Sequence, residues 1–162
     1  MNAFIRSMEE KDISAVQHVA KTSWGSTYRG IIPEAIQQKF LSNAYSEGMM
    51  QRRMERSLIY VAERNGEVIG FANFSSVKEN GEVELSAIYL IPEVQGEGIG
   101  TALLEKGLNE LENATKLFIN VEEKNQLGMR FYKAKGFQTH GAFEEELDDY
   151  ILKTIRMVKE ID

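Results

Sequence analysis

Residues 94–100 read V-Q-G-E-G-I-G and place three glycines in five positions. The run E-V-E-L-S-A-I-Y-L-I (82–91) alternates before them like a strand, and apolar residues recur at helical spacing from Ile99 to Leu111 after them. A glycine-rich turn between a strand and a helix presents backbone N–H groups beside a helix N-terminus, which suits a phosphate. One glycine alone would indicate only a tight turn. Three at alternate positions favour a ligand.

The spacing of these glycines excludes two common nucleotide sites. A P-loop needs G-x-x-x-x-G-K-[ST], and no lysine and hydroxyl pair follows the loop. A dinucleotide fold needs G-x-G-x-x-G, and the third glycine would fall on Thr101 or Leu103. Glu122 lies about 20 residues on, as that fold requires, but a meander before the loop is the wrong context.

Composition predicts an ordinary soluble domain. The chain has 162 residues, 43% of them apolar and 27% charged, so we expect one domain spanning residues 1–162. With no run of 18 apolar residues and no secretory signal, we expect no membrane contact and a cytoplasmic location. A net charge of −6 argues against nucleic acid as a partner. The absence of cysteine and the presence of only His18 and His140 predict no metal site.

The order of elements predicts the fold class. A first strand at residues 4–8 precedes helices near 13–21, which Asp12 would cap, 33–41 and 46–56. Two strands joined by Asn65-Gly66 form the strongest hairpin signal, and Asn80-Gly81 leads into the third strand. There, Val83, Leu85, Ala87, Tyr89 and Ile91 are expected to share one face. A buried parallel strand at 116–121, a helix stopped by Gly136 and a final hairpin follow. We therefore predict an α/β (α+β) fold, with a single mixed, mostly antiparallel sheet flanked by helices.

Two further motifs connect the loop to a known family. Gln95 and the glycines match the Q/R-x-x-G-x-G/A loop of the GCN5-related N-acetyltransferases (GNAT family). Asn125, Phe131-Tyr132 and Gly136-Phe137 match the family's N-x-x-A-x-x-F-Y-x-x-x-G-F pattern, except that Gly128 stands where alanine is usual. The chain thus resembles this family over residues 82–137, and its element order fits throughout. A weaker likeness, W-G-S-T-Y-R-G-I-I-P-E, is shared with members that act on small amines.

The resemblance implies acetyl-CoA as co-substrate, without a metal. The loop, Gln95, Gly96, Glu97, Gly98, Ile99, Gly100 and Thr101, would bind the pyrophosphate through backbone N–H groups. The strand residues Ile88, Tyr89 and Leu90 would pair with the pantetheine arm through their backbone. A bulge in that strand would aim one N–H at the thioester oxygen.

The resemblance also implies catalytic roles. Tyr132 matches the general acid that protonates the leaving thiolate, although a packed helix aromatic would explain it too. Asn125 is either a helix cap or a ligand of the cofactor arm. Glu84, or else Glu82, would deprotonate the amine directly or through a water, unless these glutamates are merely solvated. Some members use no side-chain base, and others place a second acid where Ser86 stands.

The acceptor is less well defined by the sequence. Trp24 and Tyr28 would border its cleft, either as faces for an ammonium group or as a packed aromatic pair. The acidic stretch F-E-E-E-L-D-D-Y (143–150) is either a polyamine attractor or a solvated loop. We expect an acetyl-CoA-dependent N-acetyltransferase for a primary amine of a small molecule such as a polyamine. Alternatives are a peptide or protein acetyltransferase, an acyl-CoA-binding sensor without turnover and a purely structural domain. Family members are frequently dimers, so a homodimer is compatible with the resemblance.

Overall fold

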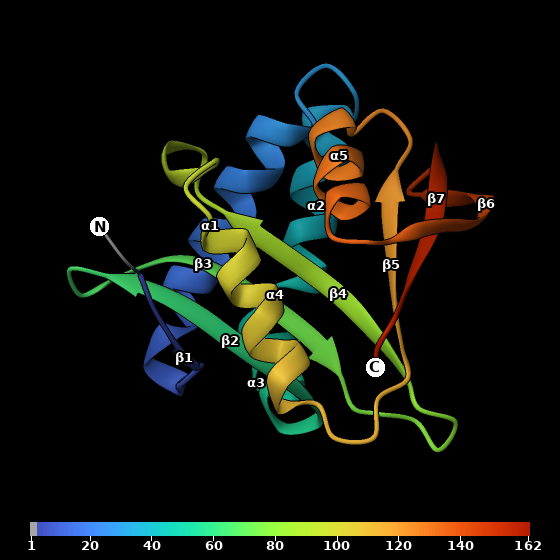
Figure 1. Ribbon diagram of the computed structural model, residues 1–162. Helices are drawn as coiled ribbons and strands as arrows, with labels where there is room; N and C mark the ends of the chain where they lie inside the picture. The colour runs from blue at the N-terminus through green and yellow to red at the C-terminus, as the bar shows by residue number, and fades with distance from the viewer. Residues whose placement is uncertain (1–2) are drawn as a thin grey trace.

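Seven strands form one mixed sheet in the order β1-β2-β3-β4-β5-β7-β6 in the computed structural model, which describes residues 3–162 (Figure 1). Only the β4–β5 pair is parallel among these strands, as the sequence predicts. The strands are β1 (Phe4–Ser7), β2 (Ser57–Arg64), β3 (Glu67–Ser75), β4 (Glu82–Leu90), β5 (Lys116–Glu122), β6 (Gln138–Leu147) and β7 (Tyr150–Glu160). The predicted fold class is confirmed.

Helices cover both faces of the sheet. They are α1 (Ile13–Thr27), α2 (Glu34–Ala44), α3 (Glu47–Arg56), α4 (Ile99–Glu110) and α5 (Gln126–Ala134), with short 3-10 helices η1 (Glu10–Asp12) and η2 (Pro92–Val94). One buried cluster lies under α4 and includes Phe74, Leu103 and Leu117. The other lies under α1 and includes Val16 and Phe71. In Figure 1, α4 lies in front of the sheet and α1 and α3 lie behind it.

The two hairpins have the turns that their sequences require. Asn65 and Gly66 both adopt positive φ, 54° and 80°, as a two-residue turn between β2 and β3 demands. Asp148 and Asp149 do the same between β6 and β7, with φ of 48° and 68°. Both predicted hairpins are confirmed.

The start of α1 differs from the prediction, because Asp12 does not cap it through its side chain. The carboxylate of Asp12 instead accepts two hydrogen bonds from Arg6, at 2.8 and 3.0 Å, and one from the backbone N–H of Glu9 at 2.8 Å. The Arg6 hydrogen bonds lower the pKa of this buried carboxyl. Asp12 therefore ties β1 to the turn before α1.

A bulge in β4 overturns the predicted alternation of its side chains. Ala87 pairs with Asn73 and Leu85 pairs with Phe74, so Ser86 is the additional residue. Because one extra residue reverses the faces, Ala87 and Tyr89 pack on the α1 side, whereas Ile88 and Leu90 pack on the α4 side with Leu85. The bulge that the family resemblance implies is present, and it turns the Tyr89 side chain toward α1.

Strands β4 and β5 separate soon after they pair. Their parallel register covers only residues 82–84 of β4 and 116–118 of β5. Beyond Glu84, β4 keeps its partner β3 but diverges from β5. The opening between the two strands positions the candidate site.

Candidate active site

A cavity of about 470 Å³ occupies the opening between β4 and β5. Its walls come from the C-terminal half of α1, from β4 beyond the bulge, from the glycine loop with the start of α4, and from the end of β5 with α5. Its lining includes Trp24, Tyr28, Ser86, Ile88, Tyr89, Leu90, Gln95, Gly96, Gly98, Gly100, Thr101, Asn120, Asn125, Gly128, Tyr132 and Lys135. Most of the residues predicted from the sequence therefore meet in one place.

Two of the three glycines in the loop are required by the backbone conformation. Gly96 and Gly98 have φ of 84° and 86°, a left-handed conformation that side chains disfavour. Gly100 has ordinary backbone geometry, and an added Cβ would make only van der Waals contact with the ring of Phe131, at 3.4 Å. The first two glycines therefore shape the turn, whereas the backbone does not require the third.

The N-terminus of α4 is well suited to an anion. Gly98 occupies the N-cap position and has no side chain to bind the first N–H groups of the helix. The only acidic residue of the loop, Glu97, pairs with Arg64 of β2 at 2.8 Å. Glu97 and the buried Ile99 are not among the described residues that line the cavity. An anion at this end would contact the free backbone N–H groups of α4. The nearby carboxylate of Glu97 would repel it less, because Arg64 pairs with that carboxylate.

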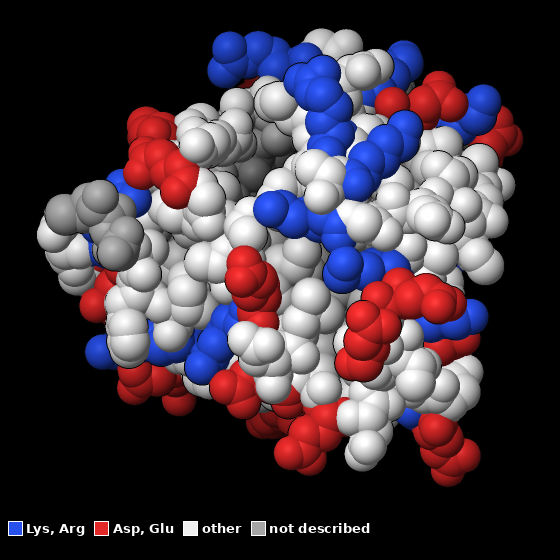
Figure 2. All heavy atoms as spheres, viewed as in Figure 1, with Lys and Arg blue, Asp and Glu red and all other residues white. Residues whose placement is uncertain are grey.

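Positive charge gathers beside the same end of the cavity, although the protein as a whole carries a net charge of −6. Figure 2 shows Lys and Arg side chains around a hollow next to α5. Helix α5 contributes Arg130 and Lys133, and Lys135 follows at its C-cap and lines the cavity. The segment from Asn125 to Lys135 contains no acidic residue. Local charge therefore also favours an anionic ligand here.

Tyr132 lies on the cavity wall and packs against two other aromatic rings. Its ring centroid is 5.4 Å from that of Phe131 and 5.5 Å from that of Phe137. Burial, with a smaller contribution from Tyr89, raises the pKa of its phenol. Tyr132 is thus both a packed aromatic and a protonated hydroxyl at neutral pH.

Asn125 caps α5, which confirms one of its two predicted readings. Its Oδ1 accepts a hydrogen bond from the backbone N–H of Gly128 at 2.9 Å. Tyr28, at the C-cap of α1, lines the same cavity. A Cβ on residue 128 would lie 2.7 Å from the Asn125 amide nitrogen, so Gly128 leaves the room that this arrangement uses. The departure from the family's usual alanine therefore has a local structural reason.

The wall of the cavity at Trp24 and Tyr28 is aromatic. Trp24 is buried, stacks on Phe40 with ring centroids 4.5 Å apart, and lies 4.8 Å from the ring of Tyr28. Its Nε1 donates a hydrogen bond to the hydroxyl of Tyr89 at 2.9 Å. Burial raises the pKa of Tyr28 above its usual range. Trp24 and Tyr28 form the packed pair that the sequence allows, and both also line the cavity.

Glu84, the predicted base, is bound by Arg156 of β7. Both carboxylate oxygens accept hydrogen bonds from this guanidinium, with Nη1 3.0 Å from Oε1. Among the described residues that line the cavity, Asn120 is present and Glu84 is not. Asn120 accepts a hydrogen bond from the same Nη1 at 3.0 Å. Direct proton abstraction by Glu84 is therefore disfavoured, and its role as a base stays a prediction for a variant to test.

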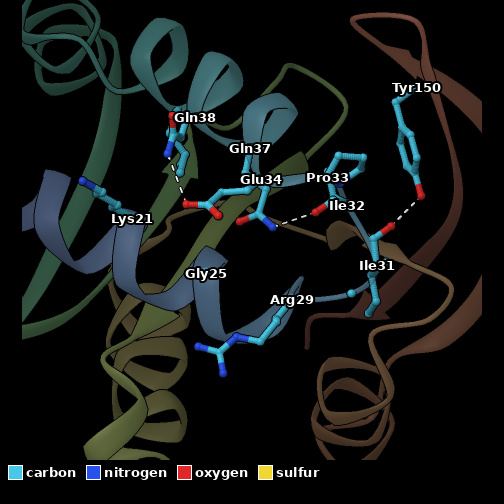
Figure 3. A pocket seen from close by; sticks show the side chains of 12 residues that line it. Lys21, Gly25, Arg29, Ile31, Ile32, Pro33, Glu34, Gln37, Gln38 and Tyr150 are labelled. Carbon is cyan, nitrogen blue, oxygen red and sulfur yellow. Dashed lines mark hydrogen bonds between the residues drawn. The ribbon is translucent and has the colours of Figure 1, made fainter.

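A second hollow of about 590 Å³ lies between α1, the segment after it and α2 (Figure 3). Gln37 donates hydrogen bonds to the carbonyls of Tyr28 and Ile32 and so fixes the segment between the helices. Lys21, Arg29 and Glu34 also line this hollow. Their mixed charges favour no single class of ligand.

The acidic turn between β6 and β7 packs against that same segment. The hydroxyl of Tyr150 donates to the carbonyl of Ile31 at 2.5 Å (Figure 3). Asp148 pairs with Lys39 of α2 at 2.7 Å. Part of the acidic stretch is thus bound to the protein itself.

Several site residues were not predicted from the sequence. Asn120 had a visible signal, because it is the polar residue in the apolar run K-L-F-I-N-V. No signal in the sequence pointed to Lys135, because its position depends on the C-cap of α5. None pointed to the side chain of Tyr89 either, because its direction depends on the β4 bulge. Within residues 3–162, no group of three or more metal-binding side chains is found. None of the helices in that range is long and apolar enough to cross a membrane.

Comparison with known proteins agrees with this geometry. The model of the Acetyltransferase (GNAT) family matches residues 23–137. An uncharacterized N-acetyltransferase, YuaI of Bacillus subtilis, is 34% identical over 138 residues, 80% of this chain and 77% of its own. A spermidine N(1)-acetyltransferase of Thermoplasma acidophilum is 26% identical over 161 residues, 94% of this chain and 97% of its own.

Solved structures share the fold. The PaiA N-acetyltransferase of Thermoplasma acidophilum, in complex with coenzyme A, superimposes with a TM-score of 0.89 at 23% identity over 99% of each chain. The ribosomal-protein-S18-alanine N-acetyltransferase of Escherichia coli superimposes with a TM-score of 0.75 at 25% identity, over 99% of this chain and 94% of that one. With its matching family model, glycine loop and cavity, the chain belongs to the acetyltransferase (GNAT) family.

Proposed function

We propose that this GNAT-family N-acetyltransferase moves the acetyl group of acetyl-CoA to the primary amine of a small molecule such as a polyamine. One observation carries the proposal. The cavity between β4 and β5 joins an anion-binding end, at the glycine loop, to an aromatic end, at Trp24 and Tyr28. Acetyl-CoA fits the first end and an amine fits the second.

The anion-binding end supports acetyl-CoA in three ways. The N-terminal N–H groups of α4 would bind the pyrophosphate. Lys135 would interact with a phosphate at the rim. The β4 edge from Ile88 to Leu90, which diverges from β5, would hydrogen-bond the pantetheine arm as an added strand.

The reaction needs little beyond positioning and one proton donor. The neutral amine nitrogen attacks the thioester carbonyl carbon, the C–N bond forms and the C–S bond breaks. The sulfur takes the phenolic proton of Tyr132, and the extra proton of the new amide leaves through water. Tyr132 then regains a proton from solvent. The Tyr132 phenol is protonated at neutral pH, as this role requires.

Deprotonation of the acceptor ammonium has a less direct route. Glu84 would accept the proton of the ammonium group only through a water molecule, since Glu84 does not line the cavity. Asn120 does line it and hydrogen-bonds the same Arg156 guanidinium as Glu84, so such a water would lie near Asn120. An amine that enters in its neutral form would need no side-chain base. The effect of pH on a Glu84 variant separates these two routes.

The acceptor class rests on the aromatic end and on the relatives. Aromatic faces such as those of Trp24 and Tyr28 attract ammonium groups. The Thermoplasma acidophilum relative named for spermidine covers nearly the whole chain. The Escherichia coli enzyme named for a ribosomal-protein alanine makes a protein amino group the second candidate.

Thiol release from acetyl-CoA across a panel of polyamines, aminoglycosides, amino acids and N-terminal peptides tests the proposal. We expect the fastest release with a polyamine or another small primary amine. Release only with peptides would move the acceptor to a protein amino group. Binding of acetyl-CoA without release for any amine would identify a sensor and overturn the proposed activity.

A further inference from the structure

The turn after α1, residues 28–32, begins at Tyr28 and closes on its backbone. Tyr28 occupies the C-cap of α1, where its N–H donates to the carbonyl of Trp24 at 2.8 Å. The carbonyl of Tyr28 accepts hydrogen bonds from the N–H groups of Ile31 at 2.9 Å and Ile32 at 3.0 Å. Gly30 allows this turn, because its φ of 78° is one that side chains disfavour. The backbone position of Tyr28 is therefore tied to that of residues 31 and 32.

Two side chains from other elements hold the same turn. The Nε2 of Gln37 in α2 donates to the carbonyl of Ile32 at 2.9 Å and to that of Tyr28 at 3.3 Å. The hydroxyl of Tyr150, at the start of β7, donates to the carbonyl of Ile31 at 2.5 Å (Figure 3). A carbonyl oxygen only accepts hydrogen bonds, so the nitrogen of the Gln37 amide must face this turn. Both side chains thus act on the backbone of the turn.

Gln37 and Tyr150 lie outside the cavity between β4 and β5. Both line the second hollow, and neither is among the described residues that line the cavity. Gln37 is buried, and Tyr150 is half-buried. Next to Tyr150, Asp148 pairs with Lys39 of α2 at 2.7 Å, so the β6–β7 turn also contacts the helix that carries Gln37. Any effect of these two side chains on the cavity must pass through residues 28–32.

The turn after α1 carries the Tyr28 ring to the cavity. This ring lies 4.8 Å from the ring centroid of Trp24, and both residues line the cavity. A tyrosine side chain has few rotamers, so the position of its backbone largely determines where its ring lies. A turn that is free to shift would move the Tyr28 ring and uncover the indole of Trp24.

We propose that Gln37 and Tyr150 are positioning residues for the acceptor amine. By holding the carbonyls of residues 28, 31 and 32, they fix the Tyr28 ring in the aromatic wall of the cavity. The β6–β7 turn therefore contributes to the site through the hydroxyl of Tyr150. The inference rests on the proposed function, because it requires the amine to bind against Tyr28.

The kinetics of Gln37→Met and Tyr150→Phe on the best amine of the panel test this inference. Methionine keeps the length of Gln37 and removes its donors, and phenylalanine removes only the hydroxyl of Tyr150. We expect Gln37→Met to raise the KM for the amine about three- to tenfold, with kcat and the Kd for acetyl-CoA unchanged. Tyr150→Phe should raise it less, since one hydrogen bond is lost instead of two. In a Tyr28→Ala background neither change should raise the KM further.

Gln38→Met is the matched control for Gln37→Met. Gln38 is the next residue of α2 and lines the same hollow, but its amide donates to Glu34 at 3.3 Å and not to the turn after α1. We expect Gln38→Met to leave the KM for the amine unchanged. Equal rises in KM for the Gln37 and Gln38 variants, or an unchanged KM in both Gln37→Met and Tyr150→Phe, would overturn the inference.

The fluorescence of Trp24 reports on the same wall without turnover, because Trp24 is the only tryptophan in the sequence. We expect its emission to move to longer wavelength in Gln37→Met and Tyr150→Phe, as the indole becomes exposed to water, and to stay unchanged in Gln38→Met. A lower melting temperature with unchanged emission and KM would mean that Gln37 and Tyr150 have only structural roles. A wild type inactive toward every amine would overturn the proposed function and the role in amine binding together. An active wild type whose KM is unchanged in both variants overturns the inference alone.

Discussion

Arg156 on β7 binds both carboxylate oxygens of Glu84 on β4 and so crosses over β5, which lies between these strands. The guanidinium also lies 4.4 Å from the ring centroid of Phe118 in that middle strand. The hydrogen bonds to Glu84 raise the pKa of Arg156. The pair therefore links three strands at the point where β4 and β5 begin to separate.

This arrangement predicts that Glu84→Gln affects stability more than catalysis. Arg156 binds both oxygens of this carboxylate, and Glu84 is not among the described residues that line the cavity, so we expect a loss of less than about tenfold in kcat/KM. The melting temperature should fall by a few degrees, as for a partly exposed pair worth about 1 kcal/mol. A hundredfold loss that recovers as pH rises, at an unchanged melting temperature, would identify Glu84 as the base after all.

Gly98→Ala should weaken acetyl-CoA binding. Residue 98 has φ of 86°, where a side chain costs about 1 to 2 kcal/mol, and it supports the N-terminus of α4. We expect about a tenfold rise in the Kd for acetyl-CoA by calorimetry. Gly48→Ala on α3 is the control, because open space surrounds Gly48 and its φ is ordinary. Equal affinities in the two variants would show that the loop conformation does not support binding.

Lys135→Gln should make acetyl-CoA binding weaker and less dependent on salt. The ammonium of Lys135 lies at the cavity, 5.8 Å from the ring centroid of Phe131, where it can interact with a phosphate. We expect roughly a three- to tenfold rise in Kd at low ionic strength, which shrinks at high salt because the interaction is screened. Lys106→Gln on α4, where Lys106 pairs with Glu110, should change neither quantity. An unchanged Kd for Lys135→Gln at low salt would remove Lys135 from the binding site.

Asp12→Asn should lower stability at neutral pH by about 1 to 3 kcal/mol, because it removes the buried carboxylate that binds Arg6, while Arg6 keeps its ion pair with Glu63. The folded pKa of Asp12 lies below 3.8, so its contribution is fully present above pH 3.8 and is lost as pH falls through the folded value. Thermal unfolding between pH 2 and 7 should show the wild type and the variant converging at the acid end. A difference that stays constant down to pH 2 would contradict this pairing. Asp148→Asn, at an exposed pair, should change little across the range.

Local signals were sufficient for much of the fold and for one end of the site. The glycines of the loop and Asn65-Gly66 were predictable, because positive φ is a property of one or two residues. The position of the β4 bulge was not predictable, since a register shift of one residue depends on how β4 pairs with β3. Contacts such as Trp24 to Tyr89 and Arg156 to Glu84, 65 and 72 residues apart, depend on the assembled sheet. The aromatic wall of the cavity at Trp24 depends on such a contact, which is why the sequence described it least.

The kcat of Tyr132→Phe on the best amine of the panel, with the Kd for acetyl-CoA measured alongside, tests the central claim most directly. Tyr132 packs against Phe131 and Phe137, and phenylalanine preserves that packing while it removes the proton donor. We predict a fall in kcat of about a hundredfold or more, with the Kd changed less than about threefold. An unchanged kcat at neutral pH would contradict the account, because the leaving thiolate would then receive its proton from elsewhere.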